Sequence, residues 1–118
     1  MRTFRDLIAF RKAYKMALYL HKLSLKFPKY EQVELAGQLR RASKSVALNI
    51  AEGFSRKDAS LSEFKRFLVI ARSSADEVRV CIDFCKDLSY ITTEIHLSIE
   101  QEYIEIGKLL TSMLKNWT

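Results

Sequence analysis

The 118-residue chain has few of the residues that interrupt regular structure, with only three glycines and one proline. Turns and sheet corners usually need more of both, so this composition favours long helices joined by few turns. A hydrophobic content of 48% and a charged content of 29% are ordinary for a globular protein. We therefore expect one domain over residues 1–118, with a core large enough to need no disulfide or metal.

Residues that carry metal or nucleophile chemistry are also scarce. His21 and His96 are far apart, neither has a partner at metal-ligand spacing, and no paired Glu-x-x-His motif is present. No serine stands in a nucleophile elbow, and there is no glycine-rich phosphate loop. We expect no catalytic residue, no metal site and no cofactor, so the chain is not predicted to be an enzyme.

The two cysteines and the absence of long apolar runs bear on the compartment. Cys81 and Cys85 are four residues apart, so on one helix they point the same way and predict neither a disulfide nor a metal site. Free thiols fit a reducing cytoplasm. No segment approaches 18 uninterrupted apolar residues, and the start MRTFRDLIAF has no cleavage signature. We expect a cytoplasmic protein with no membrane span and no signal peptide.

Apolar residues recur at spacings of three and four along four segments, which predicts four amphipathic helices. These segments cover about residues 4–27, 31–53, 61–88 and 92–117. Short connections make neighbouring helices antiparallel, so the predicted fold is all-α, an up-down-up-down four-helix bundle. The first segment is expected to face the core with Leu7, Ile8, Phe10, Tyr14, Ala17, Leu18 and Leu25.

Local signals mark where the helices begin and end. Pro28 ends the first segment, because the residue before a proline is disfavoured in the helical region. Gly53 is predicted to cap the second in a left-handed conformation. Ser60 and Glu63 form a capping-box pattern that starts the third, and Thr92 or Thr93 caps the fourth.

Charge is distributed unevenly along the chain, whose net charge is +6. Residues 1–57 hold 13 lysines and arginines against four acidic residues, a net +9. Residues 58–118 hold seven against ten, a net −3. A cationic half suits nucleic acid. The same asymmetry suits self-association, with the basic surface of one protomer against the acidic surface of another.

Ten basic residues are candidates for contact with nucleic acid. They lie on the first helix and on the second helix with its following loop: Arg11, Lys12, Lys15, Lys22, Lys26, Arg40, Arg41, Lys44, Arg56 and Lys57. They either form solvated faces that keep the protein soluble or a surface that binds phosphates. No zinc-finger or RRM signature is present, so any binding is expected to go to the backbone or shape of the nucleic acid.

Asn49, Glu52 and Gly53 form a second polar group beside the apolar stripe of the second helix. One interpretation is a structural network, in which Glu52 accepts hydrogen bonds from the following loop and Asn49 bridges two helices. The other is a contact with a ligand or another subunit.

Three stretches of the chain carry a family resemblance: FRDLIAFRKAYKMALYLHKLSLKFP, QLRRASKSVALNIAEGFSR and SEFKRFLVIARSSADEV. They resemble the small bacterial four-helix-bundle proteins of intervening sequences in 23S ribosomal RNA genes. The accessory proteins of diversity-generating retroelements are related to this family. The matching positions include Phe27-Pro28, Gln38 to Ala42, Ser45, Asn49 to Gly53, Glu63-Phe64 and Phe67-Leu68.

The resemblance implies an antiparallel four-helix bundle, often assembled as a ring-like homopentamer. In the retroelement branch it also implies nucleic-acid binding by a basic surface, alongside a reverse transcriptase. The general family has no established activity. We therefore expect a non-enzymatic, oligomeric protein that binds RNA or DNA non-specifically. The alternative is a homo-oligomer scaffold or protein-interaction module with no nucleic-acid role.

Overall fold

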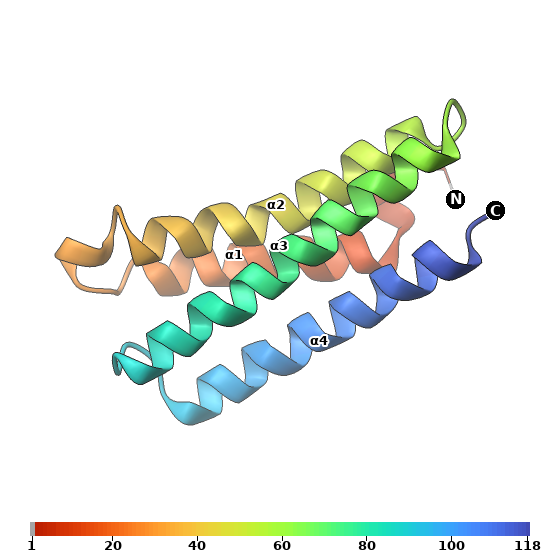
Figure 1. The fold of residues 1–118 in the computed structure, drawn as a ribbon. Helices are drawn as coiled ribbons and strands as arrows, with labels where there is room; N and C mark the ends of the chain where they lie inside the picture. The colour runs from red at the N-terminus through yellow and green to blue at the C-terminus, as the bar shows by residue number, and fades with distance from the viewer. Residues whose placement is uncertain (1) are drawn as a thin grey trace.

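The computed structural model describes residues 2–118, and the helices account for most of them. The four α-helices are α1 (Ile8–Ser24), α2 (Leu35–Arg56), α3 (Leu61–Asp87) and α4 (Thr93–Asn116). Two single-turn 3₁₀ helices, η1 (Phe4–Asp6) and η2 (Lys29–Glu31), precede α1 and α2, and residues 2–118 contain no strand. Successive helices run antiparallel, with both chain ends at one end of the bundle (Figure 1). The predicted all-α, four-helix bundle is confirmed.

The helices do not pack equally against one another. α2 packs extensively against both α1 and α3, and α3 packs against α4, whereas the contact between α1 and α4 is small. The bundle measures 45 × 24 × 20 Å along its principal axes. Every extensive helix–helix contact is therefore between helices that follow each other in the chain.

The core stripes of α3 and α4 agree with the prediction except at Leu88, which was expected to end the α3 stripe and is 50% exposed. Each presents a row of buried apolar side chains to the interior, from Phe64 to Cys85 on α3 and from Ile99 to Leu110 on α4. Both helices start at a predicted cap. Ser60 Oγ accepts a hydrogen bond from the backbone N–H of Glu63 at 3.2 Å, and Thr92 Oγ1 caps α4 in the same way.

The predicted core face of α1 is partly wrong. Ile8, Tyr14, Leu18 and Leu25 are between 49% and 59% exposed. Leu7 and Ala17 are buried as predicted, and the rest of the buried face consists of Ala9, Ala13, Met16 and Leu20. Small side chains let neighbouring helices approach closely, which leaves the larger apolar residues of α1 on the outside.

The predicted end of the second helix at Gly53 is also wrong, because α2 continues to Arg56. No described glycine has a positive φ. Gly53 is buried where α2 meets α3, and a Cβ placed on it would lie 2.9 Å from Phe67 Cβ and 3.0 Å from Phe64 O. Close helix–helix approach, and not a left-handed turn, therefore explains this glycine.

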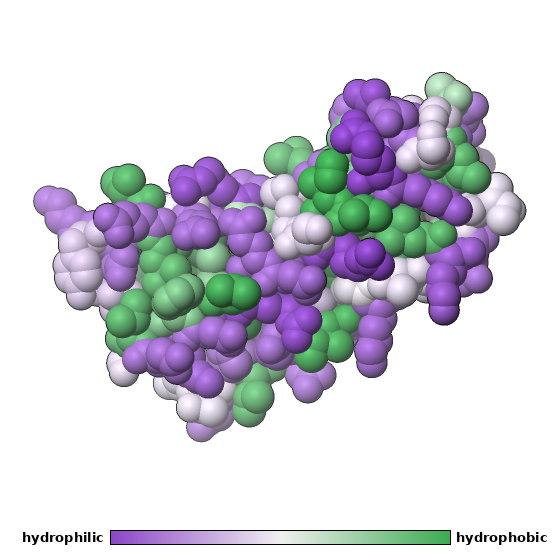
Figure 2. Space-filling model, in the orientation of Figure 1, coloured by the Kyte–Doolittle hydropathy of each residue, from purple (hydrophilic) through white to green (hydrophobic). Residues whose placement is uncertain are grey.

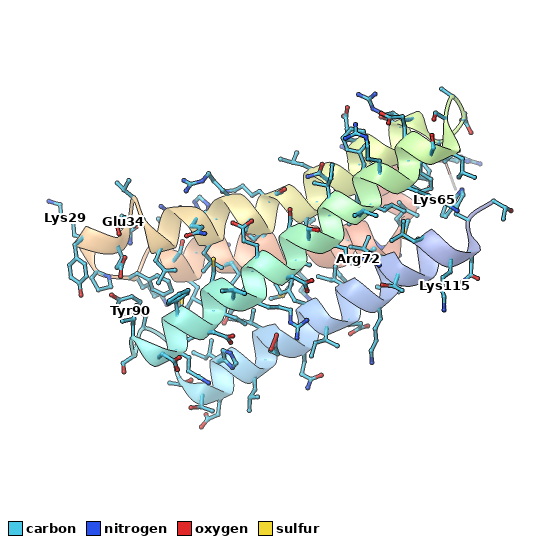
Figure 3. All side chains as sticks on the ribbon, in the orientation of Figure 1. Lys29, Glu34, Lys65, Arg72, Tyr90 and Lys115 are labelled. Atoms are coloured by element: carbon cyan, nitrogen blue, oxygen red, sulfur yellow. The ribbon has the colours of Figure 1, made fainter. Side chains whose placement is uncertain are left out.

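The connection between α1 and α2 is bonded to the connection between α3 and α4. Tyr90 donates its hydroxyl to Glu31 Oε2 at 2.7 Å, and its ring lies 5.4 Å from that of Phe27. Figure 3 shows Tyr90 at the end of the bundle that also carries Lys29 and Glu34.

No helix in residues 2–118 is both long enough and apolar enough to cross a bilayer.

Candidate nucleic-acid interface

The outer face of α1 carries a row of exposed cations. Arg11, Lys15 and Lys22 follow spacings of four and seven, which places them on one stripe of the helix, and Lys26 lies in the turn just after the helix. Among residues 2–118, no carboxylate lies within 4.0 Å of their side-chain nitrogens. Arg11 donates one hydrogen bond, to the backbone O of Arg5 at 3.3 Å. The stripe is therefore electrostatically unpaired.

Two cations of α2 extend this surface. Arg41 and Lys44 are exposed, and in the described part of the chain they too have no carboxylate within ion-pair distance. Lys44 Nζ lies 2.9 Å from His21 Nδ1 on α1, so it sits over the seam between the two helices. We call the six residues Arg11, Lys15, Lys22, Lys26, Arg41 and Lys44 the α1–α2 basic surface.

An apolar groove of about 510 Å³ lies along the same seam. Its lining is Phe4, Phe10, Tyr14, Ala17, Leu18, His21, Lys44, Ala47, Leu48 and Ala51. The rings of Phe4 and Phe10 meet edge to face at 4.8 Å, and Phe10 lies 5.9 Å from Tyr14. Tyr14, Leu18 and Leu48 are all about half exposed or more, so the apolar surface is open to solvent. We call this feature the α1–α2 groove.

Arg40, although predicted with the binding residues, is committed within the fold. Its Nη1 donates to Ser24 Oγ at 2.8 Å, and its Nη2 donates to the backbone O of Gln32 at 2.7 Å. A further bond at 3.2 Å runs from Nη1 to Gln32 Oε1. The half-buried guanidinium thereby ties α2 to the end of α1 and to the turn between them.

Three other predicted cations are matched by acidic neighbours. Lys12 Nζ lies 3.2 Å from Glu105 and 3.9 Å from Glu102, both on α4. Arg56 pairs with Glu52 at 2.8 Å, and Lys57 pairs with Asp58 at 2.9 Å. The structure thus brings six of the ten candidates together without acidic partners and gives the other four partners inside the molecule.

The predicted polar network exists in a different form. Asn49 donates to the backbone O of Ser45 at 2.8 Å and to its Oγ at 3.0 Å. The bridge between α2 and α3 is made by Ser45 and Ser74, whose hydroxyls lie 2.8 Å apart. In residues 2–118 no loop N–H donates to Glu52, whose exposed carboxylate binds Arg56 instead. Asn49 therefore supports a helix bridge, and the predicted role of Glu52 is wrong.

One polar cluster was missed from the sequence. Buried His96 Nε2 lies 2.7 Å from Asp83 Oδ1, and Glu100 brings a third potential metal-ligand atom within 4.8 Å of both. The donor types suit a metal ion. However, Arg79 Nε already donates to Glu100 at 2.6 Å, and this bond raises the pKa of Arg79. Two compensated pairs thus join α3 to α4. Only the antiparallel pairing of these helices brings the four residues together.

The two cysteine thiols are not activated as nucleophiles or metal ligands. Both are free and buried, and burial raises the pKa of Cys81 to about 11 and that of Cys85 to about 12. Since the thiolate is the nucleophile and the metal ligand, neither cysteine is activated near neutral pH.

Comparison with known proteins finds a matching family and a similar solved structure. A model of the 23S rRNA-intervening sequence protein family matches residues 5–112. The crystal structure of a protein of unknown function from the S23 ribosomal protein family of Bacteroides thetaiotaomicron superposes with a TM-score of 0.81 at 31% sequence identity. That alignment covers 92% of this chain and 100% of the other. No curated protein matches. Neither matching description states a catalytic activity.

Proposed function

This chain belongs to the 23S rRNA-intervening sequence protein family, and from that premise we propose that it is a non-catalytic, oligomeric protein that binds nucleic acid. Binding takes place on the α1–α2 basic surface and is directed at phosphates, with no preference for base sequence. The observation that carries the proposal is the set of six unpaired cations on α1, the turn after it and α2. The free, buried thiols of Cys81 and Cys85 favour the cytoplasm as its location.

The distribution of ion pairs favours phosphate binding over a merely solvated face. A face that only confers solubility carries both signs of charge interspersed. On α3, by contrast, two of the three arginines sit beside a carboxylate, Arg66 with Glu63 and Arg79 with Glu100. The α1–α2 basic surface departs from that pattern, and unpaired like charges on one side create the positive potential that attracts a polyanion.

Salt dependence tests the proposal. Each phosphate contact releases counterions, so six contacts give a slope of log K against log salt of about −4 to −5. Fluorescence anisotropy with a labelled structured RNA, over a range of salt, measures this slope. The triple variant Lys15→Ala/Lys22→Ala/Lys26→Ala should make the slope shallower by roughly 2 to 3.

A matched control removes the same charge elsewhere. Lys65, Lys86 and Lys115 lie on α3 and α4 and, in the described residues, form no ion pair. Figure 3 labels Lys65 and Lys115 on this half of the bundle. Their triple alanine variant should leave the slope unchanged. The proposal fails if the parent protein shows no salt-dependent binding at micromolar concentration, or if both variants weaken binding equally.

The second candidate function is that of a homo-oligomer scaffold without a nucleic-acid role. An exposed strip of Val69, Val80, Phe84 and Leu88 runs along the outer face of α3. Figure 2 shows such apolar side chains exposed along α3 among polar ones. Exposed apolar strips rimmed by polar residues are typical of protein–protein contacts. In the proposed assembly each subunit buries this strip against another subunit, with a homopentamer as the expected form.

Native mass spectrometry tests the assembly separately from nucleic-acid binding. Phe84→Glu should convert the oligomer to monomers, because it places a charge in the buried strip. Leu97→Glu is the control, since Leu97 is exposed to a similar extent on α4. A monomeric parent protein at micromolar concentration would refute the assembly. An oligomer that binds no RNA would favour the scaffold function.

A further inference from the structure

Tyr14 stands between two hollows, one on the α1–α2 seam and one beside α1 alone. The α1–α2 groove lies on one side, and a second hollow of about 450 Å³ lies on the other, lined by Arg5, Phe10, Arg11, Tyr14, Lys15 and Leu18. Phe10, Tyr14 and Leu18 line both. These three residues therefore form a ridge with open space on each side. The ridge belongs to α1, which lies beside α2 in the bundle (Figure 1).

The charges around the ridge are of one sign. Arg5, Arg11, Lys15 and Lys44 line the two hollows, and no described Asp or Glu lines either. An occupant must then combine flat apolar surface with negative charge. Anionic groups would meet the rim cations, and an apolar plane would meet the aromatic ridge. The volume of the groove is within the range of sites for small ligands, about 300–1,000 Å³.

We infer that the α1–α2 groove takes up unpaired nucleotides, with bases stacked on Tyr14 and Phe10 and phosphates on the adjacent cations. The inference rests on the proposed function and specifies its ligand as single-stranded nucleic acid. Bases in a single strand are free to stack on aromatic side chains, and such stacking is tolerant of sequence. A duplex keeps its bases paired and stacked, so it meets only the cations. Single strands therefore bind more tightly than duplexes of the same length.

The variants follow from the positions of two tyrosines on α1. Tyr14 is 49% exposed on the ridge, whereas Tyr19 is 44% exposed outside both hollows. Tyr14→Ala removes the stacking face, and Tyr14→Leu removes it while keeping apolar bulk for packing. Tyr19→Ala is the matched control. Circular dichroism on each variant establishes that the bundle is intact, and Tyr14→Leu serves if Tyr14→Ala does not fold.

The experiment measures anisotropy of the full chain with a labelled single-stranded RNA of about 16 nucleotides and with the same strand annealed to its complement. We expect Tyr14→Ala to weaken single-strand binding roughly 5- to 100-fold, with duplex binding unchanged. Tyr19→Ala should change neither. Equal loss for both RNAs, or no loss for the single strand, overturns the inference while leaving phosphate binding intact. If neither RNA binds the parent protein, the proposed function itself fails.

Two further experiments distinguish nucleic acid in the groove from a second subunit and from a membrane surface. Native mass spectrometry of Tyr14→Leu should give the mass of the parent assembly. A change of oligomer size would assign the groove to a subunit contact and overturn the inference. Co-sedimentation with vesicles of phosphatidylserine and phosphatidylcholine should be unaffected by the variant. Loss of vesicle binding without loss of single-strand binding would also overturn the inference, in favour of a membrane surface.

Discussion

Two glycines inside helices are expected to respond to alanine in opposite directions. A Cβ on Gly53 would lie 2.9 Å from Phe67 Cβ and 3.0 Å from the carbonyl oxygen of Phe64. Neither atom can move aside by a side-chain rotation, because the Phe64 oxygen belongs to the main chain and the Phe67 Cβ is bonded directly to it. A Cβ on Gly107 would meet no described heavy atom within 4 Å. The helix propensity gain of alanine over glycine is the same at both positions, about 1 kcal/mol.

The expected difference in stability between Gly53→Ala and Gly107→Ala therefore comes from packing. Overfilling a well-packed contact costs about 1–3 kcal/mol, and two rigid contacts place Gly53→Ala near the upper end. After the propensity gain, this variant should be less stable than the parent by about 2 kcal/mol. Gly107→Ala should be more stable by about 1 kcal/mol. Since a domain of this size shifts by roughly 4 °C per kcal/mol, the two Tm values should differ by about 12 °C.

Urea and thermal unfolding followed by far-UV circular dichroism measure both changes. The scans are repeated at several protein concentrations, because assembly contributes to stability and makes Tm concentration-dependent. A Gly53→Ala protein as stable as the parent would refute the close approach of α2 and α3. A Gly107→Ala protein that is destabilised at every concentration would show that the outer side of this glycine is covered.

Three further predictions concern residues outside this contact. Arg40→Ala should lower the free energy of unfolding by about 1–3 kcal/mol in urea titrations, because it removes three hydrogen bonds, while the salt slope of RNA binding stays unchanged. A slope shallower by about 1 would instead place Arg40 on phosphate. Ser89 has φ 65° directly after α3, so Ser89→Gly should raise Tm, and a lowered Tm would contradict the left-handed cap. Burial raises the pKa of Cys81 to about 11 and that of Cys85 to about 12. As pH rises, the two thiols therefore lose their protons at a lower pH in the unfolded chain than in the folded one. The free energy of unfolding should therefore fall as pH rises above 9, and Cys85→Ala should make that fall shallower.

The core face of a helix could be predicted from the sequence where the longest apolar stripe faces inward. On α3 and α4 the stripes from Phe64 to Cys85 and from Ile99 to Leu110, at spacings of three and four, are buried, so periodicity locates the core there. On α1 a row of alanines and a row of larger apolar residues have the same period. The larger residues suggest the core by hydrophobicity, yet Ala9, Ala13 and Ala17 face it. Only the closeness of the neighbouring helix, which a single sequence does not reveal, distinguishes the two rows.

The candidate site was predicted in outline because charge is visible in a sequence and charge pairing is not. Lys12 is neutralised by Glu105 from the other end of the chain, and Arg40 is held by Ser24 and Gln32. Neither partner could be found from local spacing. The α1–α2 groove was missed for the same reason as the core face of α1. Its apolar lining was assigned to the interior, although Tyr14 and Leu18 are on the surface.

The unequal packing of the four helices has a consequence for how the chain folds. The extensive contacts join α1 to α2, α2 to α3, and α3 to α4, so each forms by closing only a short loop. The contact between α1 and α4 is the one that requires the whole chain to come together. Proteins dominated by local contacts fold quickly, and their least-contacted elements open first. α1 and α4, each held by one extensive contact, should therefore open before α2 and α3 and show earlier amide exchange.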